Sequence, residues 1–206
     1  MIIVGAKGFA KELLQNFHDS GNESDIAFFD DLNPEIIQVF NQFPVLKNDA
    51  EVMNHFRIYG NDFILGIGNS LIRYRMARKF QNLGGHLKSC ISPFARIGNY
   101  DIQIGEGATI LAGSIISNNV TIGNGCLIYY NSVVTHDCQI GDFVEISPAA
   151  NILGRCKIGN FTQVGANATI LPDITVGENV IVGAGAVVTR DIPKNCVVVG
   201  VPAVLK

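Results

Sequence analysis

The residues best suited to chemistry in this sequence are His136 and Asp137, a histidine followed directly by an aspartate. An imidazole gains and loses its proton near neutral pH, so it can act as a general base toward an attacking group. The base must stand on the surface of a folded element where a substrate can reach it.

The element that positions His136 is an internal repeat of six residues. Beginning at Ile104, every sixth residue is aliphatic, and ordinary amounts of isoleucine and valine cannot produce such a run by chance. The column consists of Ile104, Ile110, Ile116, Ile122, Ile128, Val134, Ile140, Ile146, Ile152, Ile158, Val164, Ile170, Val176, Val182 and Val188. These residues predict a buried core rather than a ligand site.

Two further regularities give the repeat its shape. A second column of mostly small residues follows four positions after the first, and an Ile-Gly or Val-Gly pair recurs every eighteen residues. Three hexads per turn predict a triangular parallel β-helix, with five coils stacked to roughly 24 Å. The corners should need positive φ, which suits glycine and asparagine there: Asn119, Gly125, Asn131, Asn167, Asn179 and Gly185.

This coil places His136 two residues after the inward Val134. The histidine therefore lies at a corner, and its imidazole should face outward into a groove. The coil should begin between Cys90 and Pro93, with one inserted residue near Asn99–Tyr100. After Asp191–Pro193 we expect the repeat to end and Val197–Lys206 to form a tail.

The first ninety residues have a different period, in which short apolar runs alternate with amphipathic stretches. Strands are predicted over Met1–Val4, Asp25–Phe29 and Phe63–Gly68, and helices over Phe9–His18, Ala50–Phe56 and Ser70–Leu83. The last helix should carry its basic residues on outer faces: Arg73, Arg75, Arg78 and Lys79. This alternation favours a small parallel sheet of the nucleotide-binding type over residues 1–89, followed by the β-helix over residues 90–206.

Ligands of such sheets bind at the carboxyl ends of the strands. Three loops follow strands at that edge, at Gly5–Gly8, Asp30–Asp31 and Gly68–Asn69. A glycine turn that opens a helix suits a phosphate, and an acid after the second strand suits a ribose or a base. The glycine turn alone is as readily a packing turn, but the three loops together favour a nucleotide ligand.

The two halves together resemble the sugar acetyltransferases of the sialic-acid O-acetyltransferase type, which include the bacillosamine-pathway N-acetyltransferase. The resemblance covers essentially the whole chain. Its motifs are Ile3–Gly8, Phe29-Asp30-Asp31, Gly66–Asn69 with Arg73, His136–Phe143 and Gly200–Ala203. It implies a left-handed coil, a homotrimer, and acetyl-CoA bound in the groove between neighbouring coils.

The resemblance also implies roles for individual residues. His136 would be the general base, Asp137 its acidic partner, and Gly154 the donor of a backbone N–H to the oxyanion. The acetyl-CoA arm would run along Gly154, Gly165, Ala166, Gly183 and Ala184. The nucleotide of the acceptor would be held by Gly8, Asp30, Asp31, Gly68, Asn69 and Arg73.

Four residues depart from the family pattern. Phe9-Ala10 replaces a His-Gly pair of the glycine turn, which leaves the nucleotide in doubt. Glu145 replaces a second histidine and Tyr129 replaces an asparagine, both near the acceptor or the cofactor. These changes suggest a different acceptor sugar or a differently bound acetyl group, and neither removes the proposed base.

The resemblance therefore predicts acetyl-CoA-dependent N-acetylation of a nucleotide-linked amino sugar, such as a 4-amino-4,6-dideoxyhexose for a surface glycan. Transfer to a sialic acid or another sugar hydroxyl is the main alternative, and a non-enzymatic nucleotide-binding scaffold is a second. Serine acetylation is disfavoured, since that family has a helical N-terminal domain. A three-histidine zinc site is disfavoured because only His136 of the four histidines lies on the coil.

Composition excludes several other classes. The net charge of -3, with scattered basic residues, provides no patch for nucleic acid. No apolar run is long enough to cross a bilayer, and the N-terminal residues lack a signal-peptide pattern. Cys126, Cys138 and Cys156 fall in the small inward column, where a thiol acts as a compact apolar residue. We expect a cytoplasmic enzyme without a metal.

Overall fold

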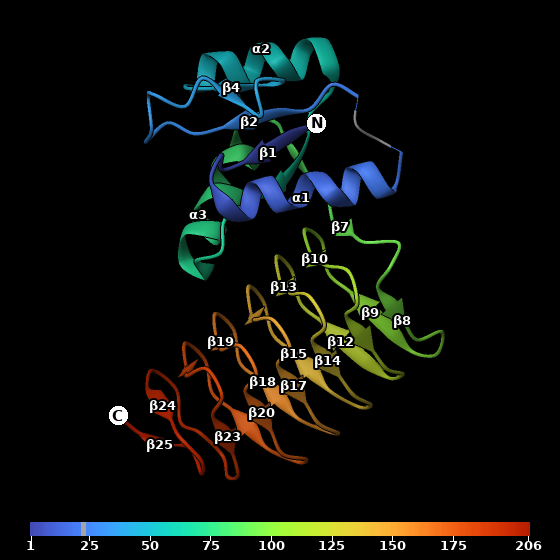
Figure 1. Cartoon of the computed structure of the whole chain (residues 1–206), viewed down its shortest axis with the longest axis vertical. Helices are drawn as coiled ribbons and strands as arrows, with labels where there is room; N and C mark the ends of the chain where they lie inside the picture. Colours follow the sequence, from blue (N-terminus) through green and yellow to red (C-terminus); the bar gives the residue numbers. More distant parts are fainter. Residues whose placement is uncertain (22–23) are drawn as a thin grey trace. The chain divides into compact units, whose positions relative to one another are not determined.

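The computed structural model describes residues 1–21 and 24–206. The chain divides into two compact units, Met1–Cys90 and Ile91–Lys206 (Figure 1). The first unit carries the α/β elements and the second carries the hexad repeat. Over the two described ranges, no helix combines the length and the apolar character needed to cross a membrane.

In the part of the chain that the structure describes, the first unit is a six-stranded sheet with three helices. Its spatial order is β3-β4-β2-β1-β5-β6, and all neighbours pair in parallel except β3, which is antiparallel to β4. The strands are β1 (Ile2–Val4), β2 (Ala27–Phe29), β3 (Gln38–Val39), β4 (Phe43–Leu46), β5 (Asp62–Leu65) and β6 (His86–Leu87). The helices are α1 (Gly8–Asp19), α2 (Asp49–Tyr59) and α3 (Ser70–Asn82). The predicted α/β fold is confirmed.

Both faces of this sheet are covered, as is usual for parallel sheets. On one face, Ala10 of α1 and Ile3 of β1 close on Gly66, where a Cβ would meet both side chains at 3.0 Å or less. On the other face, the ring of Phe80 in α3 makes edge or tilted contacts with three further rings, those of Phe29, Phe56 and Phe63. The core therefore fixes the strand ends that carry the loops.

The expectation that Arg73 lies on an outer face of α3 is wrong. Its residue is only 2% exposed, and its guanidinium donates hydrogen bonds to the carbonyl oxygens of Ile67 and Gly68. Arg73 shares a helical stripe with the buried Ala77 and Phe80, at spacings of four and seven residues. The loop after β5 directs the carbonyl oxygens of Ile67 and Gly68 into the protein, and the buried guanidinium of Arg73 provides their hydrogen-bond donors.

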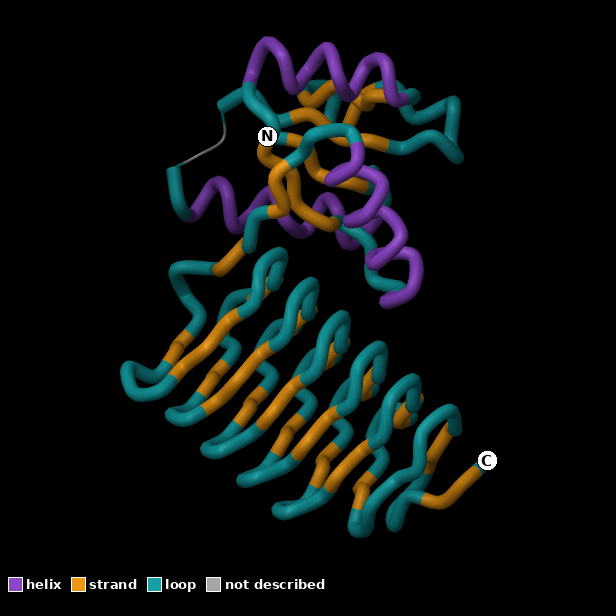
Figure 2. The backbone as a smooth tube through the Cα atoms, turned by 180° about the vertical axis from the view of Figure 1, so that it is seen from behind, coloured by secondary structure: helices purple, strands orange, loops and turns teal. Residues whose placement is uncertain are grey.

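The second unit is the predicted triangular β-helix, with three parallel faces (Figure 2). The first face contains β7 (Cys90–Ile91), β10 (Thr109–Ile110), β13 (Leu127–Ile128), β16 (Glu145–Ile146), β19 (Gln163–Val164), β22 (Ile181–Val182), β24 (Val197–Val199) and β25 (Val204–Leu205). The second face contains β8 (Arg96–Ile97), β11 (Ile115–Ile116), β14 (Val133–Val134), β17 (Asn151–Ile152), β20 (Thr169–Ile170) and β23 (Val187–Val188). The third contains β9 (Ile102–Ile104), β12 (Val120–Ile122), β15 (Gln139–Ile140), β18 (Lys157–Ile158) and β21 (Thr175–Val176).

Register in the coil follows the eighteen-residue period. Ile128 pairs with Ile146, which pairs in turn with Val164, and the aliphatic column from Ile110 to Val188 is buried. Small polar residues of the second column are buried too, and their hydroxyls donate to corner carbonyls. Ser114 Oγ donates to the Tyr129 carbonyl oxygen at 2.9 Å, for example. The interior is therefore a satisfied structural core.

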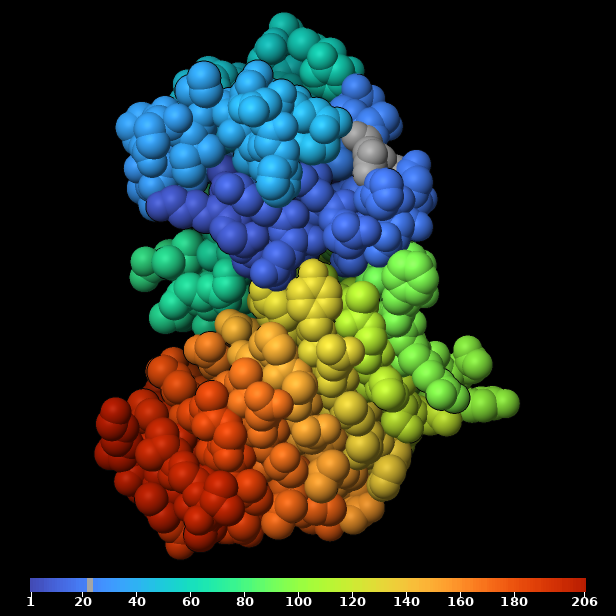
Figure 3. Space-filling view, viewed as in Figure 1, coloured from blue at the N-terminus to red at the C-terminus, as the bar shows by residue number. Residues whose placement is uncertain are grey.

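The corners adopt the backbone conformation that their residues predict. Asn119, Asn131, Asn167 and Asn179 have φ between 53° and 58°, a region that asparagine tolerates better than most residues. The predicted insertion is also present, because Ile97 pairs with Ile116, nineteen residues on. The segment around residues 98–101 projects from the surface of this unit as a light-green bulge (Figure 3).

The predicted tail is wrong, because the coil continues past Val188. Ile192 bridges in parallel to Val176, and β24 pairs in parallel with β22 at an offset of sixteen residues instead of eighteen. Ile192 and Val198 still fill inward positions. Only β25 leaves the pattern, folding back antiparallel on β24. A turn shortened by two residues hides this last coil from a strict six-residue count.

Candidate active site

His136 and Asp137 lie at the corner between the second and third faces, where β14 passes into β15. The His136 side chain is 53% exposed, so the imidazole faces outward as expected. Its Nδ1 lies 2.6 Å from Asp137 Oδ2. A hydrogen bond to a carboxylate favours the proton on Nδ1, and this leaves Nε2 as the free base.

Asp137 is held by more than the histidine. Its other carboxylate oxygen, Oδ1, accepts a hydrogen bond from Asn119 Nδ2 at 2.6 Å. The hydrogen bond with His136, followed by that with Asn119, lowers the pKa of Asp137 below its usual range. Asp137 therefore carries its negative charge at neutral pH and can stabilise positive charge that develops on the ring during proton transfer.

Gly154 lies directly beneath the imidazole, eighteen residues after His136. A Cβ on Gly154 would meet His136 Cε1 at 2.6 Å and Nε2 at 2.8 Å, so the ring rests against the glycine backbone. The neighbouring Arg155 N–H donates to the His136 carbonyl oxygen at 3.0 Å and fixes the corner from below. The structure thus brings together all three residues predicted for catalysis.

A charged pair continues the same corner. Arg155 Nε and Nη2 donate to the two carboxylate oxygens of Asp173 at 2.5 and 2.8 Å. This pairing lowers the pKa of Asp173 and raises that of Arg155. The column beneath His136 therefore contains one cation and one anion, held together at the surface.

The other predicted coil residues lie elsewhere on the prism. Tyr129, Gly165, Ala166, Gly183 and Ala184 gather at the corner between the first and second faces. There a Cβ on Gly165 would meet Ala184 N at 2.6 Å, so this corner is closely stacked.

Glu145 opens β16 on the first face, after the third corner of its coil. Its Oε1 accepts hydrogen bonds from Ser147 Oγ at 3.0 Å and from Gln163 Nε2 at 3.3 Å. Within one chain, the corner that holds His136 and Gly154 is therefore a different edge of the prism from the corner that holds Gly165 and Gly183.

The coil cysteines are internal. Cys126, Cys138 and Cys156 are buried thiols, and Cys138 Sγ donates to the Leu153 carbonyl oxygen at 3.2 Å. A hydrogen bond with Cys156, together with burial, raises the pKa of Cys138. Across residues 1–21 and 24–206, no cluster of three His, Cys, Asp or Glu side chains could hold a metal ion.

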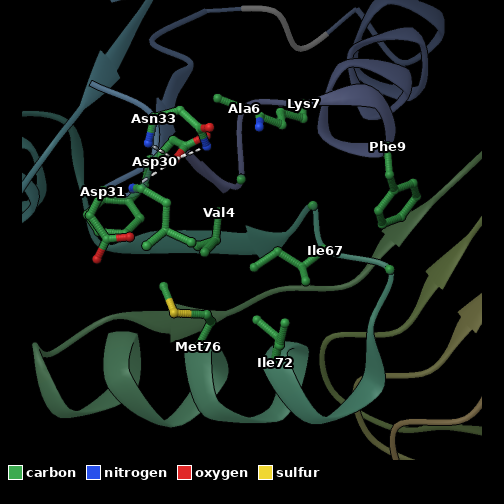
Figure 4. Close-up of a pocket in the computed structure, with 15 residues that line it drawn as sticks. Val4, Ala6, Lys7, Phe9, Asp30, Asp31, Asn33, Ile67, Ile72 and Met76 are labelled. Carbon is green, nitrogen blue, oxygen red and sulfur yellow. Dashed lines mark hydrogen bonds between the residues drawn. The ribbon is translucent and has the colours of Figure 1, made fainter. Parts of the chain in front are cut away.

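A separate cavity of about 330 Å³ opens at the carboxyl edge of the sheet in the first unit. The three predicted loops converge on it through Gly5–Lys7, Asp30–Asn33 and Gly66–Gly68. Figure 4 shows Val4, Ile67, Ile72 and Met76 gathered along the cavity, with Phe9 and Asp31 at opposite ends of the view. An apolar slot rimmed by backbone and one carboxylate suits the base and ribose of a nucleotide.

The acids of this cavity differ in their surroundings. Asp30 is buried, and its carboxylate accepts hydrogen bonds from the Leu32 and Asn33 N–H groups and from Asn33 Nδ2. It therefore shapes the loop. Asp31 is exposed and pairs with Lys79 at 3.3 Å, so it presents a carboxylate at the cavity rim.

Asn69 and Gly8 lie beside the cavity rather than on its wall. Asn69 caps α3, since its Oδ1 accepts from the Ile72 N–H at 3.0 Å. Gly8 opens α1, and both Gly8 and Gly68 have open space where a Cβ would stand. Neither has a positive φ, so the fold itself does not require glycine at these two positions.

Comparison with known proteins assigns a family model to each unit. The model of the PglD N-terminal domain matches residues 1–80, and that of the bacterial transferase hexapeptide (six repeats) matches residues 101–136 and 155–190. The acetyltransferase domain of PglB from Neisseria gonorrhoeae is 30% identical, with a TM-score of 0.91, and the match covers 100% of this chain and 98% of that one. The chain belongs to the hexapeptide-repeat sugar acetyltransferases with a PglD N-terminal domain.

Two further solved members extend the likeness. PerB from Caulobacter crescentus, solved with CoA and GDP-perosamine, is 30% identical with a TM-score of 0.90 over 100% of this chain and 96% of its own. WeeI from Acinetobacter baumannii is 27% identical with a TM-score of 0.79 over 100% and 98%. No curated protein matches in a sequence comparison. The predicted family and the left-handed β-helix are confirmed.

In this acetyltransferase, several site residues escaped the sequence analysis. Ile72 and Met76 line the cavity, yet each has the pattern of an ordinary apolar residue of a helix. Phe9 and Ile67 also line it, although the sequence marks them only as parts of the family motifs. Asn119 was seen only as a corner residue, although it lies eighteen positions before Asp137 and therefore one coil above it.

Proposed function

We propose that this chain transfers the acetyl group of acetyl-CoA to the amine of a nucleotide-linked amino sugar, such as a 4-amino-4,6-dideoxyhexose. The observation that carries the proposal is the His136–Asp137 pair, exposed at a corner with its ring against Gly154. The cavity of the first unit supplies a place for the nucleotide. PerB, a relative of this chain along its whole length, is named with CoA and GDP-perosamine.

The three corner residues divide the chemistry. His136 Nε2 accepts the proton that the amine nitrogen loses as it attacks the thioester carbonyl, and Asp137 steadies the imidazolium. The Gly154 N–H, which makes no hydrogen bond within the described part of the chain, donates to the carbonyl oxygen as negative charge develops there. The C–N bond forms, the C–S bond breaks, and the proton on His136 passes to the departing sulfur.

The nucleotide occupies the cavity of the first unit. Its phosphates approach the backbone at Gly8 and Gly68, where no side chain intervenes, and Asp31 accepts from a ribose hydroxyl or a base N–H. Asn69 and Arg73 act indirectly. Asn69 caps α3, and Arg73 holds the carbonyl side of the Gly68 loop, so that its other side faces the ligand.

Substituting Gly68 with leucine tests this nucleotide site. No atom lies within 4 Å of the position that a Cβ on Gly68 would take, so the melting temperature should not change, but the side chain would stand where the nucleotide binds. We expect the Kd for the preferred nucleotide, among UDP, dTDP and GDP, to rise about tenfold or more in calorimetric titrations. The KM for acetyl-CoA should stay unchanged. If G68L bound the nucleotide as tightly as the wild-type protein, the nucleotide site could not lie beside Gly68.

The active unit is a trimer in this proposal, built through the second face. From β11 onward the outward residues of that face are Ile115, Val133, Asn151, Thr169 and Val187. The third face instead presents the exposed Gln103, Thr121, Gln139, Lys157 and Thr175. If three second faces meet around an axis, the His136 corner of one subunit lies beside the Gly165 and Gly183 corner of the next. This arrangement completes the acetyl-CoA groove between chains.

Substituting Val133 with lysine tests the trimer. An unpaired charge buried in an interface costs about 2 kcal/mol or more, so V133K should dissociate into monomers in light scattering. Activity should fall with the trimer fraction. Gln139→Lys is the matched control, because it places the same charge on the polar third face. The proposal fails if V133K remains a fully active trimer, or if the wild-type chain is a monomer.

The assay for the proposed reaction combines acetyl-CoA with UDP-, dTDP- and GDP-linked amino sugars, and mass spectrometry reads the products. We expect one nucleotide sugar to gain a single acetyl group. Acetylation of free sialic acid with none of the amino sugars would establish the O-acetyltransferase instead. No product, together with no binding of acetyl-CoA, would leave only a nucleotide-binding scaffold.

A further inference from the structure

The carboxylate of Asp137 is shared between two side chains. Oδ2 faces His136 Nδ1 and Oδ1 accepts from Asn119 Nδ2, each at 2.6 Å. A carboxylate with one fixed oxygen can still rotate, whereas one fixed at both oxygens is held in plane. The orientation of the carboxylate, and through it that of the imidazole, therefore depends on Asn119.

Asn119 is itself rigidly placed. Its φ of 56° fits the corner, and its backbone N–H donates to the Tyr100 carbonyl oxygen at 2.9 Å. Its neighbour Asn118 accepts from the Asp137 N–H at 3.3 Å. Backbone bonds thus connect three successive coils at this corner, and the stacked corners are visible as columns of turns in Figure 2. The side-chain amide of Asn119 therefore contacts Asp137 from a backbone that hydrogen bonds hold in place.

A similar contact occurs at another corner without any base nearby. Asn179, with a φ of 53°, donates from Nδ2 to Asn195 Oδ1 at 2.9 Å, between the third and first faces. That contact joins two coils and nothing more. At the His136 corner, the acceptor is instead the carboxylate of Asp137, which also contacts His136 Nδ1. The asparagine contact there therefore affects where the imidazole carries its proton.

We propose that Asn119 is a positioning residue for acetyl transfer, which holds the Asp137 carboxylate so that His136 keeps its proton on Nδ1 and presents Nε2 as the base. The kinetic part of this inference rests on the proposed function. The structural part concerns only the tautomer of His136 and stands apart from any substrate. The charged groups acting on the pair are Arg155 and Asp173, from the two coils below.

The structural part is tested by ¹⁵N NMR of the histidine side chains. The chain has four histidines, and the spectrum of His136→Ala assigns the signal of interest. In the wild-type protein we expect the neutral form of His136 to carry its proton on Nδ1. Asn119→Gly keeps the positive φ and removes the amide, so it should shift His136 toward a mixture of the two tautomers. Asn179→Gly should leave the wild-type signal unchanged.

The kinetic part uses the same variants with the amino sugar that the wild-type enzyme accepts. We expect N119G to lower kcat about tenfold without changing either KM, as the loss of a group that orients another commonly does. Asn119→Asp should lower kcat as well.

The outcomes separate the two proposals. A tautomer shift in N119G with no wild-type acetylation of any amino sugar would sustain the positioning role and reject the function. Wild-type acetylation with N119G equal to N179G in tautomer and kcat would overturn the role of Asn119. Equal losses in N119G and N179G would make Asn119 a structural corner residue only.

Discussion

Replacing His136 with alanine is expected to lower kcat for acetyl transfer by about 100- to 10,000-fold, the range that a general base contributes. The KM for acetyl-CoA and for the amino sugar should change little, because the ring acts on the proton of the attacking amine and not on binding. The fold should survive, since the side chain is 53% exposed and its hydrogen bond is to the exposed side chain of Asp137.

His86→Ala is the matched control for this variant. His86 is also exposed and lies 3.7 Å from an aspartate, Asp62, but it belongs to the α/β unit and has no part in the mechanism. Its kcat and melting temperature should equal those of the wild-type enzyme. If H136A retains more than about a tenth of the wild-type kcat, another group must take up the proton.

Replacing Gly154 with alanine is expected to lower kcat about 100-fold, because displacing a reacting group by about 1 Å can cost that much. The added Cβ would meet the imidazole at 2.6 to 2.8 Å. Rotation of the exposed ring away from Asp137 removes this clash at the lowest cost in free energy, because the backbone stays unchanged. Gly154 has no positive φ, so alanine brings no backbone strain, and the melting temperature should hold.

The double variant shows whether the loss passes through the imidazole. If G154A acts by displacing His136, then adding it to H136A should cost nothing more, since the ring is already absent. A further loss in the double variant would show that the alanine also disturbs the Gly154 N–H or the acyl group. A wild-type kcat in G154A would contradict the close packing of ring and glycine.

The hexad coil was predictable from Ile104 to Val188 because one inward residue per strand and a similar corner chemistry repeat every six residues there. The α/β unit was harder. Its strand β4 contains Pro44, which argues against a strand, and β3 and β6 have only two residues each. These three strands form because each pairs with a neighbouring strand in the folded sheet. The local sequence pattern does not reveal such pairing.

Site residues of the coil were predictable where the eighteen-residue period places them on neighbouring coils. His136 and Gly154 stand eighteen residues apart, as do Asn119 and Asp137, so the period places each pair in contact. Arg73 was misplaced because a basic residue in an amphipathic helix usually faces water. Its buried position depends on carbonyls of a loop that only the folded chain brings to it.

The central claim is the transfer of acetyl to nitrogen, and NMR of the reaction product tests it most directly. The enzyme would be incubated with acetyl-CoA and a nucleotide-linked 4-amino-4,6-dideoxyhexose, and the purified product examined for coupling between a new amide proton and the sugar ring. We predict one amide proton, coupled to the ring proton at the carbon that carried the amine. A product whose acetyl group lies on a hydroxyl, with the amine still free, would contradict the account.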